Sequence, residues 1–263
     1  MARATKLNAG GTESDRHFVT ALARGLEILA CFSPTRTELG STELAGLTGL
    51  PQPTVWRLCH TLVKLGFLIQ TSGDKLRPGI PTLRLGYSAL AALDFTELVR
   101  PHMRALADDF HAASSLAVYD AGSMLFIQRA ESESRLLMNL RVGSRIAVVS
   151  SALGWAYLAA LPQDEREAMI AQHLSQLQDW KRVEPHLRKA LDAYRRDGYI
   201  TNTGNFHRDY NTAAVVIHDA TGRPRYTLSV GGAGSNVTPA LIRSPIGPRL
   251  VKLANALEAA ETT

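Results

Sequence analysis

The sequence predicts an α+β protein in two parts: a small N-terminal part of helices with one β-hairpin, and a larger C-terminal part with an antiparallel sheet flanked by helices. Two observations support this prediction. In the first hundred or so residues, apolar residues recur at the three- and four-residue spacing of helices, followed by one alternating hairpin pattern. From residue 115 onward, short alternating segments separated by turn residues are interspersed with further helical segments.

Composition fits a protein with a substantial core, because 45% of the 263 residues are hydrophobic. No apolar run approaches the roughly 20 residues that a bilayer-spanning helix needs. Residues 1–16 lack the apolar stretch of a signal peptide and are expected to form a disordered arm. Cys31 and Cys59, both on expected inward helix faces, fit buried thiols in a reducing compartment. We therefore expect a cytoplasmic protein.

The first two helices of the N-terminal part are predicted by spacing and capping. The segment FVTALARGLEILACF carries Leu22, Leu26 and Leu29 at helical spacing. A second, short helix is predicted in STELAGLTG, where Ser41 is a suitable N-cap and Leu44 faces inward. The short connection that follows contains a glycine, as is typical of a helix-turn-helix.

The third helix is expected to begin at Pro51 and Pro53, because proline is tolerated in the first turn, where N–H groups have no intrahelical partner. Gly66 is expected to mark its end. One stripe of apolar residues at positions i, i+3, i+4 and i+7 predicts packing against a core. That stripe consists of Val55, Leu58, Cys59 and Leu62.

The opposite face of the third helix is polar. The next segment, FLIQTSGDKLRP, alternates and turns at Ser72–Asp74, which predicts a hairpin. Together these elements predict a winged helix-turn-helix over residues 17–79, whose third helix can lie in a DNA major groove. A solvated surface helix is the alternative for the third helix taken alone. The residues expected at or near the groove are Gln52, Thr54, Trp56, Arg57, His60, Thr61 and Lys64, the last of these on phosphate.

Charge supports a polyanionic partner for this part. Residues 1–85 contain ten lysines and arginines and six acids, and their excess of +4 is most of the chain's +5. A basic first third beside a nearly neutral remainder suits a domain that binds nucleic acid.

Residues 80–100 are predicted to form a helical linker, with Leu83, Leu85, Tyr87 and Leu90 as its apolar positions. Apolar residues on such a connector often pair two subunits, although they can also dock onto their own domain. Because proline breaks a continuing helix, a new helix is expected to start at Pro101.

Residues 101–263 are predicted to form the larger α+β domain. Strands are expected in SLAVY, MLFIQRA and RLLMNLRVG, and in the hairpin formed by TAAVVIHD and RPRYTLSVGG. Helices are expected in SSALGWAYLAAL, capped by Ser150 or Ser151, near 163–172, over 184–197 and in RLVKLANALEAA.

No catalytic pattern stands out. His207-Arg208-Asp209 spells a kinase-like triplet, but the glycine-rich loop and the other kinase motifs are missing from the sequence. The eight histidines are scattered, without metal-ligand spacing to acids or cysteines. We therefore expect no catalytic residues, no metal and no cofactor.

Several segments resemble the IclR family of bacterial transcriptional regulators. ALARGLEIL, ELAGLTGLPQPTVWRLCHTLVKLGFL and LRLGYSAL are similar to its winged-helix and connector motifs, and RVGSRIAVVSSALGWAYLA to the loop and helix that open its effector pocket. By the order of elements, the resemblance covers residues 17–261. FVTALARGLEILACF resembles in particular the branch that controls aromatic-acid catabolism.

This resemblance implies a homodimer, or a tetramer built from dimers, that binds a palindromic operator. Residues 101–263 would then form an effector-binding and oligomerisation domain for a small organic, and in that branch aromatic, carboxylate. Asn202 stands where the family usually has an acid, which favours a less polar effector than glyoxylate-like acids. The effector contacts implied by position are Ala152, Leu153, Asn202, Thr212, Ser229 and Gly231.

Physical chemistry gives this pocket independent support. A helix N-terminus near Ser150 presents free N–H groups to a carboxylate, and Thr212 and Ser229 can add hydroxyl donors. Simple packing of the sheet against the helix is the alternative. Arg141 and Arg145 could neutralise the carboxylate, or could be surface residues that flank a loop.

The sequence therefore predicts a ligand-responsive, sequence-specific DNA-binding regulator, and not an enzyme. Two alternatives stay open at this point. One is an enzyme that acts on a small organic acid and carries an accessory winged helix. The other is a module whose winged helix binds a protein partner.

Overall fold

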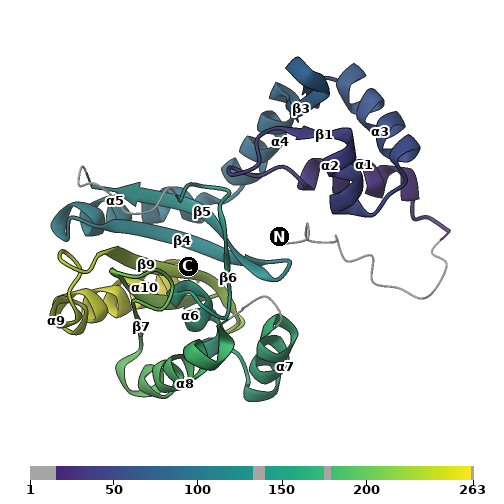
Figure 1. Ribbon diagram of the computed structural model, residues 1–263. Coiled ribbons are helices and arrows are strands. Elements are labelled where there is room, and N and C mark those ends of the chain that lie inside the picture. The colour runs from purple at the N-terminus through teal and green to yellow at the C-terminus, as the bar shows by residue number, and fades with distance from the viewer. Residues whose placement is uncertain (1–15, 133–139, 175–178, 262–263) are drawn as a thin grey trace. The chain divides into compact units, whose positions relative to one another are not determined.

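The chain folds into two compact units, residues 1–93 and residues 94–263. The structure is a computed structural model that describes residues 16–132, 140–174 and 179–261 (Figure 1). The expected N-terminal arm lies outside the described residues, except for Arg16. Helices and antiparallel sheets occur in both units, so the predicted α+β class is confirmed.

The first unit is a winged helix-turn-helix, as predicted. Its elements are α1 (Thr20–Ala30), β1 (Leu39–Gly40), α2 (Ser41–Thr48), α3 (Gln52–Lys64), β2 (Leu68–Gln70), a 3-10 turn (Ser72–Asp74), β3 (Lys75–Pro78) and α4 (Ile80–Ala91). The hairpin of β2 and β3 is joined by β1 in a three-stranded antiparallel sheet with the order β1-β3-β2. Helix α4 follows the hairpin directly and corresponds to the expected linker helix.

Local contacts fix the start of α2. The Gly40 N–H donates a hydrogen bond to Glu43 Oε2 at 2.7 Å, which makes Gly40 the N-cap. The expectation that Ser41 caps this helix was therefore wrong by one residue. Because Glu43 accepts a hydrogen bond from the Gly40 N–H, the helix is capped at Gly40, one residue before Ser41.

Glycines and prolines fix the ends of α3. Gly49 has a φ of 72° at the end of α2, and this left-handed conformation lets the chain turn into the next helix. Helix α3 begins directly after Pro51, with Pro53 in its first turn. Gly66, with a φ of 75°, follows its last turn, as the sequence predicts.

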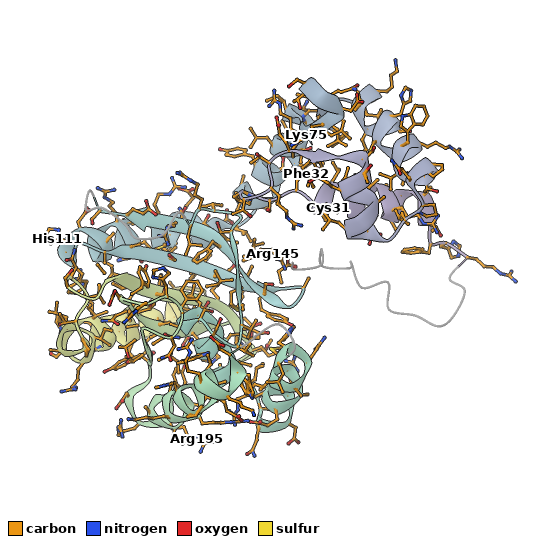
Figure 2. The ribbon with its side chains drawn as sticks, viewed as in Figure 1. Cys31, Phe32, Lys75, His111, Arg145 and Arg195 are labelled. Carbon is orange, nitrogen blue, oxygen red and sulfur yellow. The ribbon has the colours of Figure 1, made fainter. Side chains whose placement is uncertain are left out.

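The first unit encloses a small apolar core. Val55 and Cys59 of the predicted stripe are buried in it, and Leu58 and Leu62 pack against it. Cys31 (Figure 2) and Cys59 are both free thiols in this core, as expected. The buried members are Ile28, Cys31, Leu39, Leu44, Val55, Cys59, Leu68 and Leu76.

The second unit is an antiparallel sheet with helices on both faces (Figure 1). Its strands are β4 (Ala113–Asp120), β5 (Ser123–Glu131), β6 (Arg145–Ala147), β7 (Ile200–Thr203), β8 (Tyr210–His218) and β9 (Pro224–Ala233). Its helices are α5 (Asp94–Asp109), α6 (Ala152–Ala160), α7 (Gln163–His173), α8 (Trp180–Asp197), α9 (Pro239–Leu241), a π-helical segment (Ile242–Ile246) and α10 (Gly247–Glu261). The strand order is β6-β5-β4-β9-β8-β7.

The inner strands of this sheet are long and the edge strands are short. Strands β4, β5, β8 and β9 have 8, 9, 9 and 10 residues, whereas the edge strands β6 and β7 have 3 and 4. The two long hairpins turn at Ala121-Gly122 and at Thr221-Gly222, and both glycines have a positive φ.

Each face of the sheet is covered by different helices. Helices α6 and α8 pack on one face, where Trp155 and Ala214 belong to one buried cluster. Helices α5 and α10 pack on the other face, where Phe95 stacks on Tyr226 with ring centroids 4.4 Å apart. Side chains alternate along each strand, so every second residue of β4, β8 and β9 faces α6.

Helix α5 contradicts one expectation. It starts at Asp94 and runs through Pro101, where we expected a new helix to begin. Proline removes one backbone hydrogen bond inside a helix. Val99 and Met103, on either side of the proline, are both fully buried. This continuous buried stripe keeps the helix intact across Pro101.

Two strand expectations also change. The expected strand RLLMNLRVG falls partly on residues 133–139, outside the described residues, and residues 140–143 are not in a strand. The strand that pairs with β5 is instead β6, which begins at Arg145. Strand β7 was not expected, because the segment Ile200–Thr203 contains only one apolar residue and gives no alternating signal.

We predict that Cys31 and Cys59 do not react in the native protein. Burial raises the pKa of the Cys31 thiol and raises that of Cys59 to about 11, so both thiols stay protonated at neutral pH. Ellman's reagent should label neither cysteine before unfolding and both after it. The native state holds these protons more tightly, so the free energy of unfolding should also fall as the pH rises above 9.0. Rapid labelling of Cys31 or Cys59 in the native protein would contradict this prediction and would show that the core of the first unit opens readily.

Candidate functional site

Helix α3 presents the polar face that the sequence predicts. Val55 and Cys59 are buried on one side, and the opposite side is open to solvent. Thr54 lies at the border and is half-buried. The other residues expected at the groove are all exposed: Gln52, Trp56, Arg57, His60, Thr61 and Lys64.

Local contacts hold three of these side chains. The ring of Trp56, which is 61% exposed, stacks on that of His60 with a centroid distance of 5.5 Å. Gln52 Nε2 donates to Thr42 Oγ1 at 3.1 Å and so links the two helices of the motif. The Thr61 hydroxyl donates to the backbone C=O one turn earlier at 3.0 Å, so only its oxygen lone pairs remain available.

The wing adds two cations that the list of expected DNA contacts omitted. Lys75 (Figure 2) and Arg77 are exposed on β3, on either side of the buried Leu76. Their alternation with an apolar residue was visible in the sequence as part of the hairpin. Winged helices carry such cations where the hairpin can approach the phosphate backbone.

The six residues expected to bind an effector come together in the second unit. Asn202, Thr212 and Gly231 are direct partners across β7, β8 and β9, so they form one row on one face of the sheet. Ser229 lies two residues before Gly231 on β9, so it points to the same face in the neighbouring row. Ala152 and Leu153, both buried, form the first turn of α6, which packs on β8 and β9. The six residues therefore lie on the first turn of α6 and on the face of the sheet against which α6 packs.

Two polar side chains fix this helix end. Ser151 caps α6, as predicted, with its Oγ accepting a hydrogen bond from the Gly154 N–H at 3.1 Å. Asn202 Nδ2 donates to the Ser150 C=O at 3.0 Å and ties β7 to the loop before α6. Asn202 Oδ1 is buried and has no hydrogen-bond partner within the described part of the chain. A ligand group beside it would therefore have to be a donor.

Gly231 is required for close packing within this row. A Cβ on Gly231 would lie 2.8 Å from Thr212 Oγ1 and 2.9 Å from the hydroxyl of Tyr210. The phenol of Tyr210 therefore sits directly beside the expected effector residues. Burial raises the pKa of Tyr210, and the neighbouring Arg129 guanidinium offsets part of that rise.

Arg129 is the site residue that sequence reasoning missed. It pairs with Ser115 of β4, which in turn pairs with Ser229, so all three share the α6 face of the sheet. Its side chain is only 6% exposed. A lone arginine near the end of the strand MLFIQRA gave no signal, because only the pairing of distant strands puts it beside Ser229.

Two other arginines, which the sequence offered as possible carboxylate partners, lie at the surface. Arg145 (Figure 2) forms an ion pair with Asp120 and is one-third exposed. Arg141 is exposed in the loop before β6. The structure therefore does not bring either of them to the row that contains Thr212.

The described part of the second unit has surface hollows, and two prominent ones are not lined by the six expected residues. One, of about 590 Å³, lies between His218 and Glu258 at the end of α10. The other, of about 750 Å³, runs along β5 and is lined by residues that include Arg104, Arg129 and Arg141.

The described residues provide no metal site. No group of three or more histidines, cysteines, aspartates and glutamates among them is close enough to hold an ion. His207 and Asp209 of the kinase-like triplet are exposed in the loop before β8. No helix within the described ranges is long and apolar enough to cross a membrane.

Two family models match most of the chain. Residues 21–72 match the IclR helix-turn-helix domain, and residues 87–258 match the bacterial transcriptional regulator IclR C-terminal domain. The chain belongs to the IclR family. The predicted resemblance is confirmed, and this IclR-family protein is a ligand-responsive, DNA-binding transcriptional regulator.

Individual relatives agree with this assignment. The chain is 34% identical to the HTH-type transcriptional regulator TsaQ1/TsaQ2 of Comamonas testosteroni, over 94% of this chain and 90% of the relative. A crystal structure of an IclR family transcriptional regulator from Brucella abortus is 37% identical and covers 98% of each chain, with a TM-score of 0.86. An IclR homolog from Microbacterium hydrocarbonoxydans, complexed with 4-hydroxybenzoate, is 23% identical and covers 92% of this chain and 99% of its own, with a TM-score of 0.74.

The names of these relatives also bear on the enzyme alternative. The curated relative and the Brucella structure are both named as transcriptional regulators. The expectation that this IclR-family chain is a regulator and not an enzyme agrees with them.

Proposed function

We propose that this IclR-family chain is a cytoplasmic regulator that binds a palindromic operator as a homo-oligomer. Binding of a small hydroxylated organic acid would lower or raise its affinity for that operator. Residues 17–79 would bind DNA, residues 80–100 would link the parts, and residues 101–263 would bind the effector and oligomerise. The observation that carries the proposal is the row of Asn202, Thr212 and Gly231 beneath the N-terminus of α6.

The DNA-binding part of the proposal rests on α3. Its outward face combines hydrogen-bonding side chains, an exposed aromatic ring and two cations, Arg57 and Lys64. Arginine can donate two hydrogen bonds to one guanine edge, and lysine binds phosphate as a point charge. Lys75 and Arg77 on the wing are placed to add phosphate contacts. A helix that reads bases and a wing that contacts the backbone would together account for sequence-specific binding.

We predict that Arg57→Ala and Lys64→Ala weaken DNA binding in different ways. Loss of a bidentate guanine contact at Arg57 should cost about 1–3 kcal/mol on the operator and much less on a scrambled duplex. Loss of Lys64 should weaken binding to both duplexes alike. It should also reduce the slope of log K against log salt concentration by about 1. The measurement is fluorescence anisotropy at several salt concentrations, on an operator selected from random duplexes.

Arg188→Ala provides the matched control for the DNA experiment, because Arg188 pairs with Glu167 and Glu184 in the second unit. Its operator affinity should equal that of the unmodified protein. If both α3 variants bound the operator like this control, the groove assignment of α3 would be wrong.

The effector part of the proposal rests on donors and acceptors in one place. The N-terminal turn of α6 has backbone N–H groups without intrahelical partners, which favour an anion. Thr212 and Ser229 can donate from hydroxyls, and Asn202 Oδ1 needs a donor. A molecule with both a carboxylate and a hydroxyl satisfies these groups together. The homolog solved with 4-hydroxybenzoate supports an acid of this kind as the first candidate.

We predict that 4-hydroxybenzoate or a related hydroxy acid raises the melting temperature of the protein, with a stabilisation that grows as RT ln(1 + L/Kd), where L is the concentration of the acid. Thr212→Val and Ser229→Ala should each lower the affinity for that acid about three- to tenfold, because each removes one neutral hydrogen bond. Isothermal titration calorimetry gives the affinities.

Ser114→Ala is the control for the effector experiment, because Ser114 is a fully buried serine of β4 that faces away from α6. Its affinity for the acid should be unchanged. A panel of hydroxylated and simple carboxylates that neither shifts the melting temperature nor gives heat of binding would defeat the effector proposal.

The homo-oligomer part of the proposal rests on exposed apolar residues of the first unit. Leu22 and Leu26 of α1 are 62% and 48% exposed, and Phe18, two residues before the helix begins, is 49% exposed. Ile80, Leu83 and Tyr87 form a similar stripe on α4, each at least 66% exposed. Apolar stripes of this kind usually mark contact surfaces, and a second copy of the chain would cover both.

We predict that Leu22→Arg and Leu83→Arg each shift the protein toward monomers, because a charge would be buried in the interface without a partner. The dimer Kd should rise by about thirtyfold or more, because the loss of a central interface residue costs about 2 kcal/mol or more. Sedimentation velocity across a dilution series measures this. Leu65→Arg is the control, since Leu65 is 61% exposed but lies outside both stripes. Unchanged sedimentation of both variants would rule out these stripes as the interface.

A further inference from the structure

The guanidinium of Arg129 is buried and only partly satisfied. Its Nε donates to Glu131 Oε1 at 2.5 Å, and its Nη1 donates to Ser115 Oγ at 2.7 Å. Its Nη2 is also buried and has no hydrogen-bond partner among the residues that the structure describes. A buried donor of a charged group is costly to leave without an acceptor, so this position favours a bound anion.

The charge of Arg129 is weakly compensated where it is most buried. Arginine stays protonated at every physiological pH. Glu131, its ion-pair partner, is 42% exposed, so water screens the pair on that side. On the inner side, the guanidinium contacts hydroxyl groups and no second carboxylate among the described residues. Glu131 lies on the same face, because it pairs with Ala113, which pairs with Gly231. Its carboxylate therefore compensates the Nε edge of the guanidinium, and the Nη2 edge is the one that has no acidic partner among the described residues.

Arg129 belongs to the same surface as the proposed effector residues. The pairing runs from Arg129 to Ser115 and from Ser115 to Ser229, on strands about 4.8 Å apart. Tyr210, whose hydroxyl lies beside Gly231, is close enough to Arg129 for the guanidinium to influence its ionisation. Donors from three strands thus converge next to the row of Asn202 and Gly231.

We propose that Arg129 binds the carboxylate of the effector, with one carboxylate oxygen accepting from Nη2 and the hydroxyls of Ser115 and Tyr210 as neighbouring donors. The inference rests on the proposed function and names the group that selects an acid over a neutral molecule.

The test compares an acid with its neutral amide, 4-hydroxybenzoate with 4-hydroxybenzamide, by calorimetry on the full chain. The unmodified protein should prefer the acid, because the amide cannot form the charge-assisted bond. Arg129→Gln should lower the affinity for the acid about ten- to a hundredfold, because it removes a hydrogen bond between two charged groups. The same variant should change the affinity for the amide by less than about threefold, so the preference for the acid should largely disappear.

A second variant covers the case in which Arg129→Gln does not fold. Arg129→Met keeps the volume and removes the charge, and an apolar residue of similar size is often tolerated in place of a buried ion. It should lose the preference for the acid in the same way. Arg249→Gln is the matched control, because Arg249 is ion-paired with Asp109 on the other face of the sheet. It should retain the preference for the acid.

The outcomes separate the inference from the proposed function. Binding of the acid by the unmodified protein, with the same preference for the acid in both Arg129 variants, would overturn the role of Arg129 and leave the effector site standing. A merely structural Arg129 would weaken acid and amide equally, and this too would overturn the inference. If the unmodified protein bound neither compound, both the inference and the proposed effector class would fall.

Discussion

The close packing of helix α6 against the preceding loop and the sheet is the constraint on which the proposed effector site depends. Gly154, in its first turn, lies so close to the preceding loop that a Cβ would be 2.0 Å from the Val148 carbonyl oxygen. Trp155 donates from its indole to the Val149 C=O at 2.9 Å and is 1% exposed. With Ser151 as cap, this turn cannot shift without breaking buried contacts. Its free N–H groups are therefore held in a fixed position over the sheet.

Polar residues on the sheet beneath α6 are otherwise difficult to explain. Ser115, Asn202 and Ser229 are each less than 5% exposed, and burying such groups lowers stability unless they are hydrogen-bonded. The surrounding positions on the same strands are filled by alanine, valine and isoleucine, which pack without this cost. Departures from a simple apolar core are expected where a protein needs chemistry and not only stability. The concentration of these groups at one end of α6 fits a site for a polar ligand.

Local signals explain why the first unit was predictable from the sequence. Pro51, Pro53 and Gly66 act on their own backbone, so the limits of α3 and the direction of its polar face followed without any tertiary knowledge. The misplaced cap at Ser41 arose from one competing side chain, Glu43.

Long-range packing explains what the sequence could not provide in the second unit. Helix α5 continues through Pro101 because buried residues on both sides outweigh a local rule. Asn202 and Thr212 entered the candidate site through family resemblance, and their shared row became visible only with the register of β7 and β8. Arg129 had no motif at all. Its position beside Ser229 results from the order β5-β4-β9, which joins segments about a hundred residues apart.

The short edge strands have a consequence for the behaviour of the chain in a crowded cell. An exposed strand edge presents unpaired N–H and C=O groups that can recruit another chain, and the risk grows with its length. Here β6 and β7 offer only 3 and 4 residues, while the long, mostly apolar strands β4, β8 and β9 have neighbours on both sides. The sheet thus keeps its most aggregation-prone segments out of reach of other molecules.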